Sequence, residues 1–236
     1  MIGNRRGLAL ALDVVSRDEL LQWVETFRDL PLVLKVGLRL LPKLKESDFE
    51  DIKKSGFKIF VDAKLHDIPS QVSGAVKTWA SLGADYLTLH LSGGPAMLRE
   101  AAAVADATST ELLAVSVLTS LSASDLATLG LEPDPARVVE RWVRMGISSG
   151  IRSFVCSVGE SSLIHALAKK DFPQLNIHTV CPGIRLPHQA AASDQSRVFT
   201  VDEALGAGVN MLVVGRAIFQ DSNPRARAEE ILERIR

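Results

Sequence analysis

Residues 58–91 read KIFVDAKLHDIPSQVSGAVKTWASLGADYLTLHL and contain the repeating unit of the whole chain. The apolar runs at 58–64 and 86–91 are short and rich in Val, Leu, Ile and Phe, which is typical of strands buried on both faces. The segment 69–82 between them is a helical candidate, and its exit at Leu82-Gly83-Ala84 suits a glycine C-cap. The stretch therefore predicts a strand, a helix and a second strand in succession.

Similar units follow one another along the chain without a linker or low-complexity stretch. Strands are expected at residues 8–13, 32–37, 58–64, 86–91, 112–119, 153–158, 177–182 and 210–215. Helices are expected after a Ser16 cap and at residues 38–54, 69–82, 95–104, 135–145, 160–169, 201–205 and 225–235, with further glycine exits at 54–56, 145–146 and 206–208. We predict an α/β fold, a single (β/α)₈ TIM barrel domain over residues 1–236, with an open doubly wound sheet as the main alternative.

Composition narrows the class of protein. The 236 residues suit one such barrel, which takes about 250. A hydrophobic fraction of 47% with 23% charged residues excludes a disordered or fibrous chain. The formal net charge of −1 provides no positive field, so no nucleic-acid partner is expected. Two cysteines exclude a disulfide scaffold and favour a reduced, cytoplasmic location.

The N-terminal region, with Arg5-Arg6 before an apolar run, superficially matches an export signal. That run, Leu8 to Leu12, ends at Asp13, whereas signal peptides need roughly 7–15 apolar residues there. No stretch approaches the ~18 apolar residues of a membrane span. We therefore interpret the run as a strand and expect no membrane partner.

Charged residues interrupt the apolar pattern where several predicted strands end. Asp13 closes the first, Lys35 lies in the second, and Asp62 and Lys64 lie in the third, with Asp67 three residues later. Barrel active sites are built at these strand ends, and side chains two apart share one face of a strand. Two cations and two carboxylates together can hold a lysine charged and aimed at a substrate. The alternative is a solvated charge pair where a strand frays.

A second group of residues suits an anion. Gly215 and Arg216 follow the last predicted strand, and Arg185 and Gln195 follow the one before it. Barrels commonly hold phosphate between these two loops, using backbone N–H groups at a helix start. An arginine adds a bidentate donor, so the pattern predicts a phosphate site. The histidines and cysteines show no ligand spacing, and no metal site is predicted.

Seven motifs in order resemble the orotidine-5′-phosphate decarboxylase family from about residue 8 to residue 220. They are residues 8–13, Leu34-Lys35-Val36-Gly37, Asp62-Ala63-Lys64-Leu65-His66-Asp67-Ile68-Pro69, His90-Leu91-Ser92-Gly93-Gly94, Val117-Leu118-Thr119-Ser120, Pro182-Gly183-Ile184-Arg185 and Val214-Gly215-Arg216. The resemblance implies decarboxylation of orotidine 5′-phosphate to UMP, the last step of de novo pyrimidine biosynthesis. It also implies a homodimer that uses neither a metal nor an organic cofactor.

The same resemblance implies catalytic roles for four residues and a ribose contact for a fifth. Lys64 resembles the lysine that protonates C6 of the pyrimidine. Asp62 would lie beside the departing carboxylate, and Lys35 would bridge Asp62 and the ribose. Asp13 resembles a ribose-hydroxyl contact, and Asp67 resembles an aspartate that reaches the partner's site.

Further substrate contacts are implied by the resemblance. Thr119, with Ser120, would contact the pyrimidine. The phosphate would be held by Arg185, Gln195, Gly215 and Arg216, with Gln189 as an alternative to Gln195. The chain departs from the family at Ser70-Gln71, where Asn-Thr is usual, so Gln71 is a candidate for the ribose or phosphate side.

Two other functions are compatible with such a barrel. The first is a Mg²⁺-dependent hexulose- or ketogulonate-phosphate lyase. Those relatives usually have a metal-binding Glu where this chain has Lys35, which argues against a lyase. The second is a non-catalytic barrel that binds a nucleotide phosphate. The charges of Lys35, Asp62, Lys64 and Asp67 argue against it, because binding alone does not require them.

Overall fold

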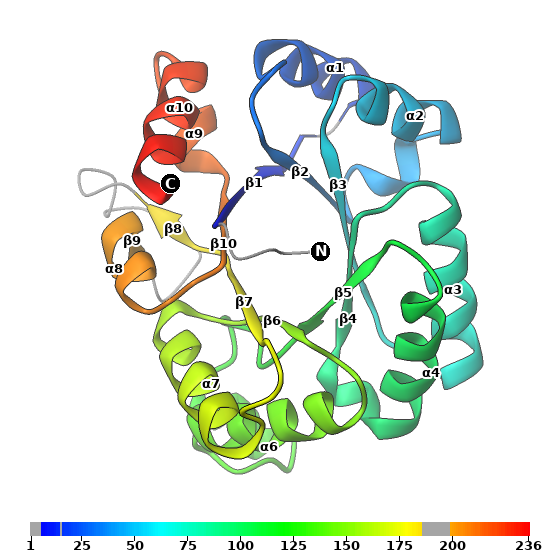
Figure 1. The fold of residues 1–236 in the computed structure, drawn as a ribbon, viewed down its shortest axis with the longest axis vertical. Helices are drawn as coiled ribbons and strands as arrows, with labels where there is room; N and C mark the ends of the chain where they lie inside the picture. Colours follow the sequence, from blue (N-terminus) through cyan, green and yellow to red (C-terminus); the bar gives the residue numbers. More distant parts are fainter. Residues whose placement is uncertain (1–5, 15, 186–198) are drawn as a thin grey trace.

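Eight parallel strands close into a barrel in the computed structural model, which describes residues 6–14, 16–185 and 199–236 (Figure 1). They are β1 (Gly7–Leu12), β2 (Val33–Gly37), β3 (Lys58–Leu65), β4 (Tyr86–His90), β5 (Glu111–Val115), β6 (Ser153–Val155), β7 (His178–Cys181) and β10 (Met211–Val214). Each strand pairs with the next in the chain, and β10 pairs back with β1, so the sheet has no free edge. The predicted barrel is confirmed, and the open sheet is excluded.

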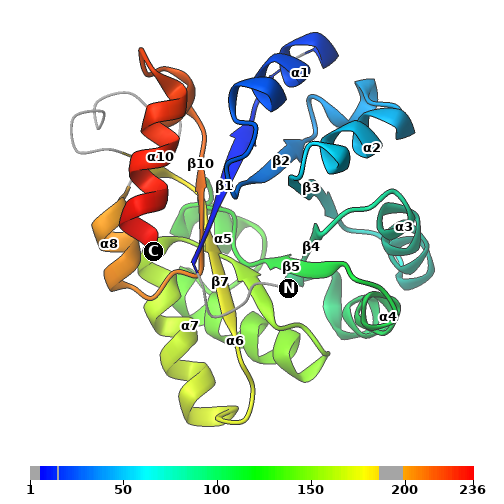
Figure 2. The ribbon, with the colours of Figure 1, turned by 45° about the horizontal axis from the view of Figure 1, so that its top comes forward.

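Helices surround this barrel on the outside (Figures 1 and 2). The longer ones are α1 (Arg17–Thr26), α2 (Glu46–Lys54), α3 (Pro69–Ser81), α4 (Gly94–Asp106), α6 (Pro135–Ser148), α7 (Val158–Asp171) and α10 (Pro224–Ile235). Ser16 caps α1 as predicted, because its hydroxyl oxygen accepts the Glu19 N–H. Among the helices of the described ranges, none is long and apolar enough to cross a membrane.

One predicted helix, residues 38–54, is broken in two. A single 3₁₀ turn, η1 (Leu41–Lys43), contains Pro42, and α2 starts only at Glu46. Between them Leu44 and Lys45 are extended, with ψ of 146° and 164°. The buried Asp48 carboxylate accepts the Lys45 N–H, which fixes the new helix start there.

The predicted helix exit at residues 145–146 is also wrong. Helix α6 continues to Ser148, and the residue with a positive φ is Gly150, at +98°. Gly146 has a packing role instead: a Cβ there would lie 2.7 Å from Cδ2 of Leu91 and 3.0 Å from Cε1 of Phe154. The helix therefore approaches the barrel more closely than any larger residue would allow.

Two strand ends and several short elements also differ from the expectation. Strand β5 ends at Val115, after which the Ser116 N–H and hydroxyl both donate to the Val155 carbonyl. Val158 belongs to α7 rather than to a strand. The short segments α5 (Ala123–Thr128), α8 (Val201–Gly206) and α9 (Arg216–Phe219) and the two-residue strands β8 (Ile184–Arg185) and β9 (Phe199–Thr200) complete the fold. Of these, only α8 was predicted.

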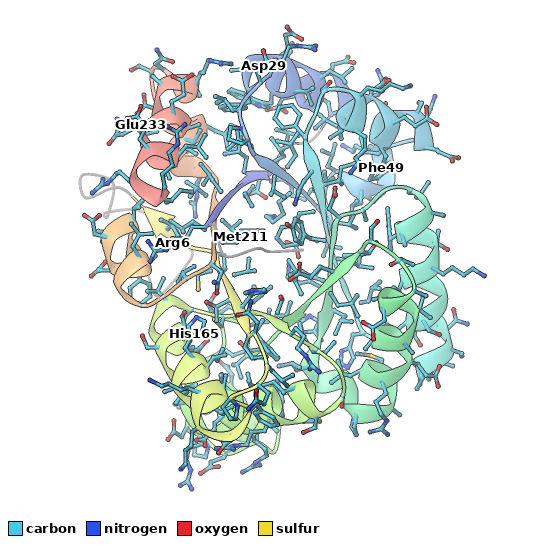
Figure 3. The ribbon with its side chains drawn as sticks, viewed as in Figure 1. Arg6, Asp29, Phe49, His165, Met211 and Glu233 are labelled. Atoms are coloured by element: carbon cyan, nitrogen blue, oxygen red, sulfur yellow. The ribbon has the colours of Figure 1, made fainter. Side chains whose placement is uncertain are left out.

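Strand alternation divides the apolar residues into two cores. On β1, Leu8 and Leu10 face the helices, whereas Ala9 and Ala11 face the barrel interior. The interior core consists of Ala9, Ala11, Val33, Phe60, Tyr86, Leu113, Val180, Met211 and Val213, and Figure 3 labels Met211 near the barrel axis. The same alternation carried towards the C-terminal strand ends brings polar side chains inward, so this packed interior forms the floor of the candidate site.

Candidate active site

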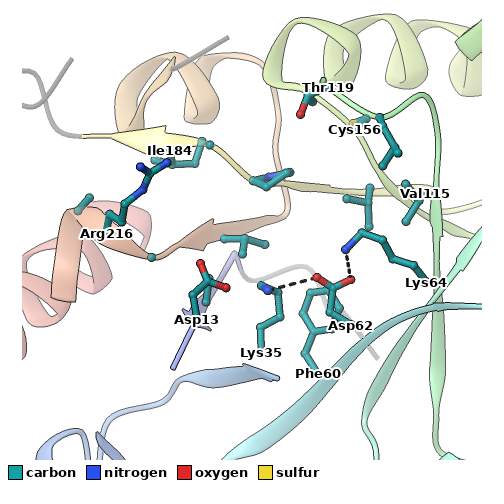
Figure 4. A pocket seen from close by; sticks show the side chains of 18 of the residues that line it. Asp13, Lys35, Phe60, Asp62, Lys64, Val115, Thr119, Cys156, Ile184 and Arg216 are labelled. Carbon is teal, nitrogen blue, oxygen red and sulfur yellow. Dashed lines mark hydrogen bonds and ion pairs between the residues drawn. The ribbon is translucent and has the colours of Figure 1, made fainter. Parts of the chain in front are cut away.

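A cavity of about 350 Å³ opens at the C-terminal ends of the barrel strands (Figure 4). It is lined by Ala11, Asp13, Lys35, Phe60, Asp62, Lys64, Val115, Val117, Leu118, Thr119, Val155, Cys156, Pro182, Gly183, Ile184, Val213, Gly215, Arg216 and Ala217. Seven of the predicted site residues are in this set, and they come from both ends of the sequence. The barrel therefore brings together residues that lie up to two hundred positions apart.

Asp62 lies between two ammonium groups on one side of the cavity. Lys64 Nζ is 2.8 Å from Asp62 Oδ1, and Lys35 Nζ is 3.2 Å from Asp62 Oδ2. The Asp62 and Lys35 side chains are 13% and 12% exposed, whereas Lys64 is 33% exposed and reaches into the cavity. Strand pairing explains the geometry, because β2 and β3 lie side by side and put Lys35 opposite Phe60, two residues before Asp62.

The buried Thr88 on β4 is a site residue that the sequence analysis missed. Its hydroxyl oxygen accepts the backbone N–H of Lys64 at 2.8 Å, and its O–H donates to Asp62 Oδ1 at 3.0 Å. A threonine in an apolar strand carries no sequence signal for such a role. It could have been found only from the alternation that places Tyr86, Thr88 and His90 on one face of β4.

The backbone at Lys64 is unusual for a strand. Lys64 has φ of +50°, in the left-handed region that non-glycine residues rarely adopt. The pairing of β3 with β4 shifts register between Val61 and Leu65, which accommodates this conformation. Backbone strain of this kind concentrates at functional sites because the surrounding structure has to hold it.

The charge state of Asp62 follows from its neighbours. Burial by itself would raise the pKa of this carboxyl, but attraction to Lys35 and Lys64 and the hydrogen bonds from both outweigh it. The net result is a pKa below the ordinary value, so Asp62 is ionised at neutral pH. The cluster of one carboxylate and two ammonium groups then carries a surplus positive charge facing the cavity.

A pair of histidines lies beside this cluster. The rings of His66 and His90 are 5.6 Å apart. Burial lowers the pKa of His90, and the nearby His66 and Lys64 lower it further. His90 is therefore neutral at physiological pH, so it adds no charge beside Lys64.

Across the cavity, β10 and α9 supply the features expected of an anion site. Gly215 follows β10, and Arg216 is the first residue of α9. A Cβ at Gly215 would lie 3.2 Å from the Ala11 Cβ and 3.8 Å from Asp13 Oδ2, so glycine allows the two strand ends to approach. Figure 4 shows Asp13 between Arg216 and Lys35, and Thr119 on the opposite wall.

Three predicted site residues do not line the cavity of one chain. The exposed Asp67 carboxylate accepts the N–H of the next residue, Ile68, and makes no ion pair within the described ranges. Gln71, in the first turn of α3, and Ser120 are exposed outside the cavity. Four charged groups were predicted to form one alternating network, and within a single chain only three of them do so.

Two of the four predicted phosphate ligands line the cavity, Gly215 and Arg216, and the other two are Arg185 and Gln195. Gln195 and its alternative Gln189 lie outside the described residues, and of Arg185 only the backbone, in β8, is described. The prediction that they bind phosphate stays a prediction.

The cavity wall also contains Cys156, which the sequence analysis left out. Its Sγ lies 3.8 Å from Sγ of Cys181 on the adjacent strand, and both thiols are buried. The hydrogen bond with Cys181, together with burial, raises the pKa of the Cys156 thiol. The Cys156 thiol is therefore protonated at neutral pH and serves as packing in the cavity wall. Within the described ranges, no group of three or more His, Cys, Asp or Glu side chains could hold a metal ion.

The arrangement suits an elongated ligand with an anionic group near Arg216. Its other end would lie against the ammonium of Lys64, in a position to receive a proton or to have developing negative charge stabilised. Apolar side chains such as Val155 and Ile184 line the space between these two ends.

Comparison with known proteins gives consistent matches over nearly the whole chain. Residues 6–231 match the family described as Orotidine 5′-phosphate decarboxylase / HUMPS family. The orotidine 5′-phosphate decarboxylase of Campylobacter concisus (strain 13826) is 37% identical over 231 residues, which is 97% of this chain and 99% of that protein. The enzyme of the same name from Wolbachia pipientis subsp. Culex pipiens (strain wPip) is 33% identical over 225 residues, covering 95% and 96%.

A solved structure agrees with these matches. The crystal structure of orotidine 5′-phosphate decarboxylase from Lactobacillus acidophilus superposes with a TM-score of 0.83 at 30% identity. The superposition covers 98% of this chain and 99% of that one. Similarity therefore extends from the sequence to the complete barrel.

Proposed function

Because the chain belongs to the Orotidine 5′-phosphate decarboxylase / HUMPS family, we propose that it converts orotidine 5′-phosphate to UMP and CO₂, the last step of de novo pyrimidine biosynthesis. The observation that carries the proposal is the Lys35–Asp62–Lys64 cluster, in which Lys64 reaches into the cavity. Loss of CO₂ from C6 of a pyrimidine leaves a carbanion with little resonance stabilisation. A fixed ammonium beside C6 meets that need.

Lys64 acts as the general acid in this proposal. The bond between C6 and the carboxylate carbon breaks, CO₂ departs, and the electron pair stays on C6. Lys64 Nζ then gives its proton to C6, which forms UMP, and regains a proton from solvent. The reaction consumes one proton and needs neither a metal nor an organic cofactor. A positioned proton donor contributes about 10²–10⁴ to the rate, and the ammonium charge adds electrostatic stabilisation.

The other residues of the cluster position Lys64 and the ribose. Asp62 holds the Lys64 ammonium by the 2.8 Å contact and lies beside the carboxylate that departs. Lys35 binds the opposite oxygen of Asp62 and extends towards the ribose, which Asp13 contacts through a hydroxyl. This placement is supported by the order of Asp13, Lys35 and Asp62 along the cavity in Figure 4.

The remaining substrate contacts divide between the base and the phosphate. Thr119 contacts the pyrimidine from the opposite wall. Gly215 and Arg216 bind the phosphate, with Arg185 and Gln195 as further ligands. Ser120 and Gln71 are exposed outside the cavity of one chain, so a contact from either residue requires movement or a second copy.

A homodimer completes the site in this proposal. Asp67 lies on the exposed rim after β3, and the adjacent Ile68 is 61% exposed. Leu38, after the neighbouring strand β2, is 62% exposed. A second copy covering these apolar side chains would bring Asp67 towards the partner's site, where it would add the fourth charge that one chain lacks. We place the enzyme in the cytoplasm, with no nucleic-acid or membrane partner.

The test follows the ultraviolet absorbance of orotidine 5′-phosphate with purified protein, with and without EDTA, beside Lys64→Ala. Loss of substrate absorbance that persists in EDTA and falls by at least about 10² in the variant supports the decarboxylase and its proton donor. Activity that EDTA abolishes would favour the Mg²⁺-dependent lyase. Binding of UMP without turnover would favour the non-catalytic barrel, and near-normal activity of Lys64→Ala would remove Lys64 as the acid.

A further inference from the structure

We infer that the Thr88 hydroxyl is a positioning residue for the reaction, because it joins the backbone of Lys64 to the carboxylate of Asp62. The inference rests on the proposed function, in which those two residues perform the chemistry. Thr88 itself does not line the cavity, so it acts through them.

The Thr88 hydroxyl donates one hydrogen bond to Asp62 and accepts one from Lys64. A hydroxyl has a single proton, and here that proton goes to Asp62 Oδ1 at 3.0 Å. Its oxygen is then available to accept the Lys64 N–H at 2.8 Å. Thr88 is 1% exposed, so water cannot readily replace either bond.

The bond to Lys64 stabilises an unfavourable backbone. Lys64 has φ of +50°, and the register between β3 and β4 shifts between Val61 and Leu65. The ladder therefore does not hold the Lys64 N–H in the usual way, and the side chain of Thr88 accepts it instead. The direction of the Lys64 side chain depends on this backbone conformation.

The bond to Asp62 fixes the carboxylate that orients both ammonium groups. Oδ1 accepts from Lys64 Nζ and from Thr88, whereas Oδ2 accepts from Lys35 Nζ. The charged groups that contact Asp62 are Lys35 from β2 and Lys64 from β3, with the neutral His90 of β4 beside them, and Asp13 lies on the far side of Lys35. Thr88 is the uncharged donor of this set, so its removal changes orientation without changing net charge.

The experiment compares Thr88→Val with Thr88→Ser, and uses Thr110→Val as the matched control. Valine keeps the shape of threonine but has no hydroxyl, whereas serine keeps the hydroxyl. Thr110 is also buried, and its hydroxyl donates to the Ala84 carbonyl at 2.7 Å, away from the cavity. The measurements are kcat, KM and the pH profile for orotidine 5′-phosphate, with denaturation to follow stability.

We expect Thr88→Val to lower kcat by about 10²-fold with KM changed only a few-fold, because misplacement of a reacting group by about 1 Å costs that much. Loss of a donor to the carboxylate raises the pKa of Asp62, so the acidic limb of the profile moves to higher pH. Thr88→Ser should restore most of kcat and the acidic limb. Thr110→Val should be less stable than wild type but keep the wild-type kcat and acidic limb of the pH profile.

Contrary results are distinguishable from failure of the proposed function. Wild-type kcat and an unshifted acidic limb in Thr88→Val, or equal damage in Thr88→Ser, would overturn the inference while leaving the decarboxylase intact. If wild type does not decarboxylate orotidine 5′-phosphate, the proposed function fails, and ¹³C NMR titration of the Asp62 carboxyl in wild type and Thr88→Val decides instead. An unchanged titration overturns the positioning role. Should the valine variant not fold, Thr88→Ala carries the same readouts.

Discussion

Asp62 and Lys64 are two residues apart on one strand, and their side chains meet at 2.8 Å at the point where the backbone of Lys64 leaves the strand conformation. In a regular strand, side chains two apart point the same way and remain about 6–7 Å apart at their origins. The φ of +50° at Lys64 and the register shift beside it occur at this contact. Together they place an ammonium against a carboxylate that Lys35 also contacts.

The ion pairs of Asp62 make folding stability depend on pH. Its pKa is lowered in the folded protein, so the folded state binds a proton less readily than the unfolded chain. The stabilisation is therefore fully present above the unfolded pKa near 3.8 and is lost as the pH falls through the folded value. Asp62→Asn should destabilise the protein by about 1.5–3 kcal/mol at pH 7, with the difference narrowing below about pH 4.

Urea denaturation of wild type and Asp62→Asn at a series of pH values measures this effect. Glu233→Gln is the control, because Glu233 is exposed on α10 and makes no ion pair with any described residue (Figure 3). Its effect should be small at every pH. If the difference in unfolding free energy between wild type and Asp62→Asn stays constant from pH 7 to pH 3, Asp62 is not an ionised, stabilising carboxylate.

Arg216 should affect turnover as well as binding. Its guanidinium lines the cavity at the start of α9, remote in sequence from the reacting end. Binding energy from a distant phosphate can be used to lower the barrier at the reacting atom, so Arg216→Ala should lower kcat as well as raise KM. Steady-state kinetics with orotidine 5′-phosphate give both values. A higher KM with unchanged kcat would show that Arg216 contributes uniform binding only.

Arg234→Ala is the matched control for that experiment. Arg234 pairs with Asp202 on the outside of the barrel, and neither residue lines the cavity. Its loss should leave kcat and KM unchanged. The comparison separates a phosphate contact from a general effect of removing one positive charge.

Two glycines within helices should respond to alanine in opposite directions. At Gly146 in α6 a Cβ would meet Leu91 at 2.7 Å, so Gly146→Ala should destabilise the protein by about 1–3 kcal/mol through overpacking. At Gly74, exposed in α3, a Cβ meets nothing within 4 Å. Gly74→Ala should therefore stabilise by about 0.5–1 kcal/mol, because alanine is the better helix former. Thermal denaturation measures both, and a loss of stability at both positions would contradict the packing argument.

The sequence was sufficient to predict the barrel because buried parallel strands have a strong apolar pattern. It also predicted that Asp62 and Lys64 lie together, since strand alternation is a local property, and that Lys35 lies near them, since successive strands pair. The break at Leu44 and Lys45 was missed because the apolar spacing of 38–54 continues across it. The presence of a strand or helix follows from the periodicity of apolar residues. A break within a helix depends on individual hydrogen bonds, such as the one from the Lys45 N–H to the Asp48 carboxylate.

Other features could not be predicted because they arise from contacts distant in sequence. Thr88 is one of many strand threonines until the fold places it against Lys64 and Asp62. The positive φ of Lys64 likewise has no sequence signal, because glycine is the residue that normally marks such positions. Asp67 was predicted to reach the partner's site, and within one chain its carboxylate accepts the Ile68 N–H, so that role stays a prediction.

A subunit-mixing experiment tests whether Asp67 acts across a dimer interface. Lys64→Ala and Asp67→Ala should each be nearly inactive as homodimers. In a mixed dimer, the Asp67→Ala chain keeps its own Lys64 and receives Asp67 from the Lys64→Ala partner, so one of the two sites is complete. Random reassociation of equal amounts should restore activity to about a quarter of wild type, since half of the dimers are mixed and half of their sites are intact.

The control for this experiment mixes Lys64→Ala with Asp62→Ala. Lys64 and Asp62 contact each other within one chain, so each mixed-dimer site lacks one of them and no activity should return. Sedimentation analysis should show a dimer for all three variants. If Lys64→Ala and Asp67→Ala also fail to complement while forming mixed dimers, Asp67 acts within its own chain, and its exposed position after β3 must then change when substrate binds.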